Sequence, residues 1–87
     1  MHEFSLIKSL MRKVTGIAAE QGAKKIVSVR VVLGALCHLS PEHFTEHFVE
    51  AAAGTVAAGA ELEVVFNPDP HDPHAQDILL DSVKVEV

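Results

Sequence analysis

The sequence is poor in cysteine, in basic side chains and in long apolar runs. Cys37 is the only cysteine among 87 residues, which excludes an intrachain disulfide and a zinc site built from several cysteines. Seven Lys and Arg, dispersed along the chain, stand against twelve Asp and Glu, giving a formal charge of −5. Such a balance argues against a nucleic-acid surface, which needs clustered cations. No apolar run approaches the roughly 18 residues of a membrane-spanning helix, so we expect neither nucleic acid nor membrane as a partner.

The length and composition indicate one small globular domain that spans residues 1–87. Hydrophobic residues make up 48% of the chain and charged residues 22%, as in ordinary folded proteins. A chain of this size buries only about 60–65% of its unfolded surface, which leaves little room for a deep catalytic pocket. The start of the chain lacks the features of a signal peptide, so we expect a cytoplasmic location.

Two segments have the apolar spacing of amphipathic helices. Across residues 4–21 the apolar side chains recur at steps of three and four, and Gly22 is placed to end the helix. Ser40 and Pro41 have the residue types of an N-cap and a first helical position, which predicts a second helix over residues 41–53. The inward stripe that we expect on this second helix consists of Phe44, Phe48, Ala51 and Ala52.

Three segments alternate as strands, at residues 26–33, 60–67 and 78–87. We expect the third strand to pair with the second. The inward residues predicted by simple alternation are Val27, Val29, Val31 and Leu33 in the first strand, Leu62, Val64 and Phe66 in the second, and Leu79, Val83, Val85 and Val87 in the third. Asp81 interrupts the apolar face of the third strand. Between the last two strands, residues 68–77 contain three prolines and predict an exposed loop.

The resulting order is helix, strand, helix, strand, loop, strand. Two helices can cover only one face of a three-stranded sheet, which predicts an α/β fold: an open two-layer sandwich with both helices on a mixed sheet. If the first two strands are parallel, the last runs antiparallel to at least one of them.

Met1, His2 and Glu3 form the strongest candidate site. A free α-amine, the His2 amide and the His2 imidazole Nδ1 can close chelate rings on one ion, and the Glu3 amide supplies a fourth nitrogen. A roughly planar set of four nitrogens suits Ni(II) or Cu(II) and suits Mg, Ca or tetrahedral Zn poorly. This chemistry requires Met1 to be the true terminus and the amides to lose their protons. The competing interpretation is an unstructured terminus that binds nothing.

Histidine pairs occur at two other places. His43 and His47 are four apart on the second helix and share a face, but the HExxH pattern of metalloproteases is absent and a solvated helix face explains them as well. His71 and His74 lie in the loop among Asp69, Asp72 and Asp77, a set that could hold Zn(II), Ni(II) or Co(II). A polar linker with incidental histidines is the alternative for the loop.

The sequence carries no positive signal for an enzyme. It has no P-loop and no nucleophile elbow. Cys37 and His38 are sequence neighbours, which is not evidence of a catalytic dyad, and Cys37 is expected to be a small buried hydrophobe.

The framework as a whole resembles the HypA/HybF family of nickel metallochaperones for hydrogenase maturation. The resemblance covers nearly the full chain in the family's order. The matching stretches are Met1-His-Glu-Phe-Ser-Leu, Val29-Arg-Val-Val-Leu-Gly-Ala-Leu, Pro41-Glu-His-Phe-Thr-Glu-His-Phe, Ala53-Gly-Thr, Ala58-Gly-Ala-Glu-Leu-Glu-Val and Asp81-Ser-Val-Lys-Val-Glu-Val.

This resemblance implies that Met1, His2 and Glu3 hold Ni(II) through the amine, the backbone amides and the imidazole. It also implies delivery of nickel to a hydrogenase large subunit with the help of a maturation GTPase. In one respect the chain departs from the family: a zinc ribbon with two CxxC pairs normally stands between the last two strands, and in this chain residues 68–77 replace it. Structural zinc is therefore not expected, and His71 and His74 stand where the ribbon would be.

Three interpretations follow from the sequence. The first is a nickel-binding maturation factor. The second is a non-enzymatic protein-interaction domain of the same fold that has lost metal delivery, and a distant third is a zinc enzyme at His71 and His74. A homodimer, or strand exchange between two chains, stays open because the connection before the last strand is short.

Overall fold

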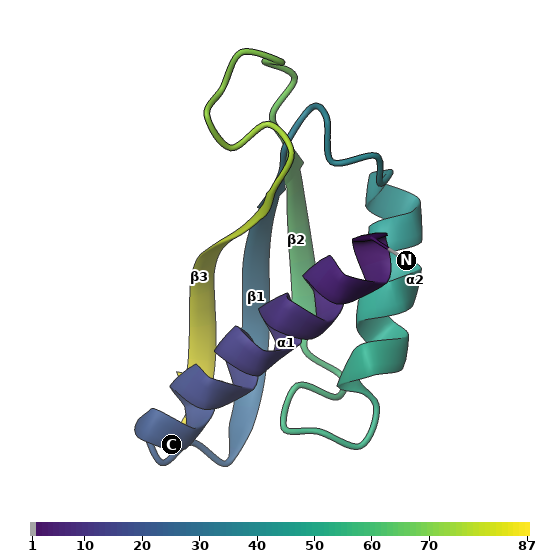
Figure 1. Ribbon diagram of the computed structural model, residues 1–87. Coiled ribbons are helices and arrows are strands. Elements are labelled where there is room, and N and C mark those ends of the chain that lie inside the picture. The colour runs from purple at the N-terminus through teal and green to yellow at the C-terminus, as the bar shows by residue number, and fades with distance from the viewer. Residues whose placement is uncertain (1) are drawn as a thin grey trace.

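The computed structural model describes the backbone of residues 2–87 and the side chains of residues 5–87. Its elements are α1 (His2–Glu20), β1 (Lys25–Leu33), α2 (Pro41–Ala52), β2 (Glu61–Phe66) and β3 (Ile78–Glu86). Both helices lie on the same face of the sheet (Figure 1). The predicted fold class, an open two-layer α/β sandwich, is therefore confirmed. Within the described residues no helix is long and apolar enough to cross a bilayer.

The sheet has the order β2-β1-β3, with β1 in the centre. β1 is parallel to β2 and antiparallel to β3. The predicted pairing of the third strand with the second is wrong, because β1 lies between β2 and β3 and pairs with both. A central strand loses its solvent contact along both edges, and β1 is the strand with buried side chains, whereas the side chains of β2 and β3 are half-buried or exposed. Its parallel partner β2 requires a crossover connection, and α2 provides it.

A β-bulge near the start of β1 changes which valine faces the core. Ile26 pairs with Val85 and Ser28 pairs with Lys84, so Val27 has no partner across the β1–β3 ladder. The extra residue shifts the alternation, and Ile26 and Val29 are buried while Val27 is only half-buried. The prediction that Val27 faces inward is therefore wrong, because simple alternation does not survive a bulge.

A second bulge, in β3, keeps Asp81 out of the core. Arg30 pairs with Ser82 and Val31 pairs with Leu80, which leaves Asp81 unpaired in the ladder. Leu80 rather than Leu79 then packs against the core, and Leu79 is 38% exposed. An unpaired buried carboxylate costs far more than one disrupted ladder position. The predicted inward position of Leu79 is wrong for this reason.

The inward prediction also fails at the ends of the two edge strands. Phe66 closes β2, which is an edge strand, and is 48% exposed, whereas its partner Leu33 in the central strand is fully buried. Val87 lies beyond the end of β3 and is 76% exposed. Leu62, Val64, Val83 and Val85 pack against the core as predicted.

The start and the inward face of α2 agree with the sequence prediction. The backbone N–H of His43 donates to Ser40 Oγ at 3.2 Å, which is the N-cap hydrogen bond, and Pro41 occupies the first turn. Phe44 and Phe48 are almost fully buried, and their ring centroids are 6.0 Å apart. Each buried phenylalanine contributes about 1.5–3 kcal/mol of apolar burial, so the pair fixes the rotation of α2 over the sheet.

The segment 67–77 is a structured loop that docks on the residues after β1. The N–H of Leu36 donates to the carbonyl of Ala75 at 2.7 Å, and the N–H of Gly34 donates to the carbonyl of Asp77 at 3.0 Å. Most of the loop is exposed as predicted, but Ala75 is only 4% exposed. A Cβ added at Gly34 would meet the Ala75 carbonyl and stand 2.6 Å from the His74 carbonyl oxygen. Only glycine allows this close approach of two backbones.

Replacing Gly34 with Ala is expected to lower the free energy of unfolding by about 1–3 kcal/mol, because the methyl group collides with backbone atoms that cannot rotate away. Chemical denaturation measures the effect. The matched control is Gly16→Ala in α1, where an added Cβ meets nothing within 4 Å. That change should raise helix stability by about 0.5–1 kcal/mol. Equal stability of the two variants would contradict the docking of the loop on Gly34.

Candidate metal centre

The predicted site at Met1, His2 and Glu3 falls at the start of α1. Met1 and the side chains of His2 and Glu3 lie outside the described residues. The backbone helix begins at His2. The first four N–H groups of an α-helix have no carbonyl partner within the helix, and the amides of His2 and Glu3 belong to this group. Metal binding by these two nitrogens therefore breaks no helical hydrogen bond.

The loop histidines are held by a set of short-range hydrogen bonds. The N–H of His71 donates to Asp69 Oδ1 at 2.9 Å, and the N–H of His74 donates to Asp72 Oδ1 at 2.8 Å. The ring Nδ1 of His74 lies 3.1 Å from Asp77 Oδ2. Asp69 and Asp72 are thus engaged in shaping the loop. Among the residues whose side chains are described, no three His, Cys, Asp or Glu residues are grouped closely enough to hold a metal ion.

The two histidines of α2 lie close together on the exposed side of the helix. Their ring centroids are 6.4 Å apart with an angle of 39° between the planes. His47 Nδ1 lies 3.8 Å from Glu50 Oε1, and the side chains are 40% and 77% exposed. The sequence placed both histidines on one face, and the structure confirms that placement.

Cys37 lies in the buried core. It is 2% exposed, and its Sγ lies 3.6 Å from the carbonyl oxygen of Leu39. The neighbouring His38 has φ 62°, a left-handed conformation that is uncommon for a residue other than glycine, and its side chain is exposed. The two side chains therefore have different environments, and the prediction of a buried structural cysteine is confirmed.

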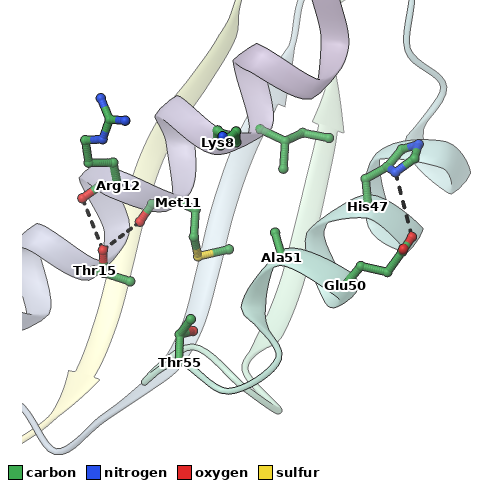
Figure 2. Close-up of a pocket in the computed structure, with 9 residues that line it drawn as sticks. Lys8, Met11, Arg12, Thr15, His47, Glu50, Ala51 and Thr55 are labelled. Carbon is green, nitrogen blue, oxygen red and sulfur yellow. Dashed lines mark hydrogen bonds and ion pairs between the residues drawn. The ribbon is translucent and has the colours of Figure 1, made fainter. Parts of the chain in front are cut away.

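A groove between the two helices is the feature that sequence reasoning missed. It has a volume of about 520 Å³. Its apolar floor residues are Ile7, Met11 and Ala51. His47 and Glu50 line the α2 side (Figure 2). The hydrophobic periodicity assigned the floor residues to inward stripes. It could not show that the two helices leave an open channel between those stripes, because the separation of helices depends on packing.

The fold matches that of two solved structures. The structure titled "Solution structure of the Ni metallochaperone HypA from Helicobacter pylori" aligns with a TM-score of 0.78 at 20% sequence identity, covering 99% of this chain and 98% of that one. A second, "Solution structure of HypA protein", aligns with a TM-score of 0.75 at 21% identity, covering 98% of this chain and 96% of that one. At these identities the likeness concerns the fold.

The sequence assigns the family. The family model described as "Hydrogenase/urease nickel incorporation, metallochaperone, hypA" matches residues 1–70. The chain belongs to this HypA family.

Curated relatives agree with this assignment. The hydrogenase maturation factor HypA of Archaeoglobus fulgidus is 42% identical over 64 residues, which is 74% of this chain and 58% of the relative. The HypA of Chlorobium limicola is 41% identical over 64 residues, which is 74% of this chain and 55% of the relative. The chain thus spans a little over half the length of these relatives. The family match ends at residue 70, inside the loop that precedes β3.

Replacing Asp72 with Ala is expected to expose the amide of His74 to solvent, because the Asp72 carboxylate accepts its hydrogen bond. Hydrogen exchange at His74 should accelerate by about fivefold or more, given about 1 kcal/mol per such bond. The matched variant is Asp69→Ala, which should accelerate exchange at His71 instead. If both variants changed both amides equally, the two turns would not be independent features of the loop.

Proposed function

We propose that this chain is a nickel-binding metallochaperone that serves the maturation of a nickel enzyme such as a [NiFe]-hydrogenase. The observation that carries the proposal is the HypA family match, which begins at residue 1 and so includes Met1, His2 and Glu3. Hydrogenase maturation is the role named for the curated relatives. The runner-up is an interaction domain of the same fold without metal delivery, and the groove of about 520 Å³ between the helices is the feature that favours it.

The proposed ligands are four nitrogens: the α-amine of Met1, the amides of His2 and Glu3, and the His2 imidazole. A cation at a helix N-terminus is normally disfavoured, because that end of the helix carries partial positive charge. Two deprotonated amides remove this conflict, since their two negative charges neutralise Ni(II). The helix start at His2 supports the proposal, because these amides have no helical acceptor to lose.

The delivery role requires binding without catalysis. A site at the end of a chain is open on one side, so ligands of a partner can approach the ion and displace the chain's own ligands one at a time. The partners proposed are the large-subunit precursor of a hydrogenase and a maturation GTPase, with the protein in the cytoplasm and free to form a homodimer. Ni(II) is cargo in this role.

We propose that residues 1–87 contain no zinc ribbon. The only cysteine is buried in the core, and residues 68–77 contain none. The loop connects β2 directly to β3, so the single α/β domain accounts for residues 1–87. His71 and His74 are the secondary nickel candidates, with Nδ1 of His74 already beside Asp77.

Acetylation of the Met1 α-amine is expected to abolish planar nickel binding, because the amine then has no free electron pair. The test is a Ni(II) titration of acetylated and unmodified protein, following the weak d–d absorption of planar Ni(II). Acetylation is preferred to a one-residue extension, because an extension would put histidine third, where it chelates nickel with the amine and two amides. Equal absorption from both forms would refute the proposed ligand set.

Replacing His2 with Ala should remove the same absorption, because the imidazole nitrogen is lost. The matched control is the double change His71→Gln and His74→Gln, which should leave the absorption nearly intact. Both loop histidines are exposed, so neither replacement disturbs the core. Loss of the signal in the loop variant alone would move the site to the loop.

A further inference from the structure

The exposed flank of α2 carries a repeated pattern that the proposed nickel site does not use. Residues 43–50 read His-Phe-Thr-Glu-His-Phe-Val-Glu, which is His-Phe-X-Glu twice. The two phenylalanines are buried in the core, which fixes the helix so that His43 is exposed and His47 is half-buried at the edge of the groove. A spacing of four residues places the two rings one turn apart on the same face.

We propose that His43 and His47 form a second, independent site for a borderline divalent cation such as Ni(II), Cu(II) or Zn(II). Imidazole nitrogen is a ligand that suits all three ions. The site does not rest on the N-terminal ligands, because it lies on a different helix and uses different donors.

The two rings can reach one ion after a change in their side-chain rotation. With metal–nitrogen bonds of about 2.0–2.1 Å, the centroids of two imidazoles on one ion lie about 4.5–6.4 Å apart, depending on the bond angle. The observed centroid separation of 6.4 Å is the value for two imidazoles on opposite sides of an ion, which neighbouring turns of one helix do not allow, so the two rings must approach to about 4.5–5 Å to share an ion. Because both rings are at the surface, a small rotation about their side-chain bonds brings them closer without any change in the core.

The neighbouring glutamates suit the outer positions of such a site. The Glu50 carboxylate lies 3.8 Å from Nδ1 of His47, which leaves Nε2 of that ring to face an ion. That distance is longer than a hydrogen bond, and a closer approach by about 1 Å would let the carboxylate orient a ligating His47 and raise the basicity of its ring. Glu46 follows His43 by the same three residues. Two carboxylates beside the rings also raise the local concentration of cations.

The surroundings leave room for the remaining ligands. His47 and Glu50 line the groove between α1 and α2, opposite Arg12 and Thr15 of α1 (Figure 2). Since no third His, Cys, Asp or Glu among the described side chains completes a closed set, water occupies the other positions of the ion. Such a site exchanges its metal rapidly, in contrast to a closed structural zinc site.

The experiment uses the full chain with its Met1 α-amine acetylated, so that the terminal chelate is blocked, and NiCl₂ as the probe. Calorimetry gives the affinity. Six-coordinate Ni(II) is paramagnetic, so NMR shows its position as broadening of nearby amide signals, expected in α2. His43→Gln and His47→Gln should each weaken binding at least about tenfold, because one imidazole no longer holds the ion for the other.

Two control variants test whether metal binding requires the four-residue spacing of the histidines or only their presence in the chain. The exchange Thr45→His with His47→Thr keeps the same residues but places the histidines two apart, on different sides of the helix, and should lose the affinity as His47→Gln does. His71→Gln removes an exposed histidine elsewhere and should change nothing. Circular dichroism confirms that each variant is folded. Unchanged affinity in His43→Gln, or broadening centred on residues 71–77, would overturn the proposal.

Discussion

The burial of β1 is the constraint on which the rest of the structure depends. Ile26, Val29, Val31 and Leu33 are buried beneath the helices, and both edges of the strand are paired. Its parallel partner β2 can be reached only by a crossover, so α2 must lie on the sheet. Its antiparallel partner β3 then occupies the other edge. Both β-bulges lie on the β1–β3 ladder. Each bulge shifts the alternation by one residue, so that apolar side chains continue to face the core where simple alternation would turn a polar one inward.

The same core sets the position of every candidate ligand whose side chain the structure describes. Phe44 and Phe48 hold α2 in one rotation, which turns His43 and His47 outward. The absence of a side chain at Gly34 lets the loop before β3 approach the end of β1, and this fixes where His74 stands. The positions of the candidate ligands on the surface therefore depend on apolar packing and close backbone contacts in the interior.

Local signals in the sequence predicted the elements well, and the pairing between them less well. Ser40 and Pro41 marked the start of α2, and the alternation of apolar residues found all three strands. The errors at Val27 and Leu79 share one cause: a bulge inserts a residue, and a period of two cannot reveal it. The partner of β3 was also mistaken, because strand order depends on which strand gains most from burial on both sides.

The proposed nickel ligands of Met1, His2 and Glu3 can be named from the sequence alone, because three of the four are backbone nitrogens and only the imidazole is a side chain. The sequence also determined the faces of both helices, since a period of 3.6 residues is local. The central place of β1, the position of Asp81 outside the core and the groove between the helices became visible only in the folded chain. These features arise from contacts between residues far apart in the chain, where packing and desolvation outweigh local preference.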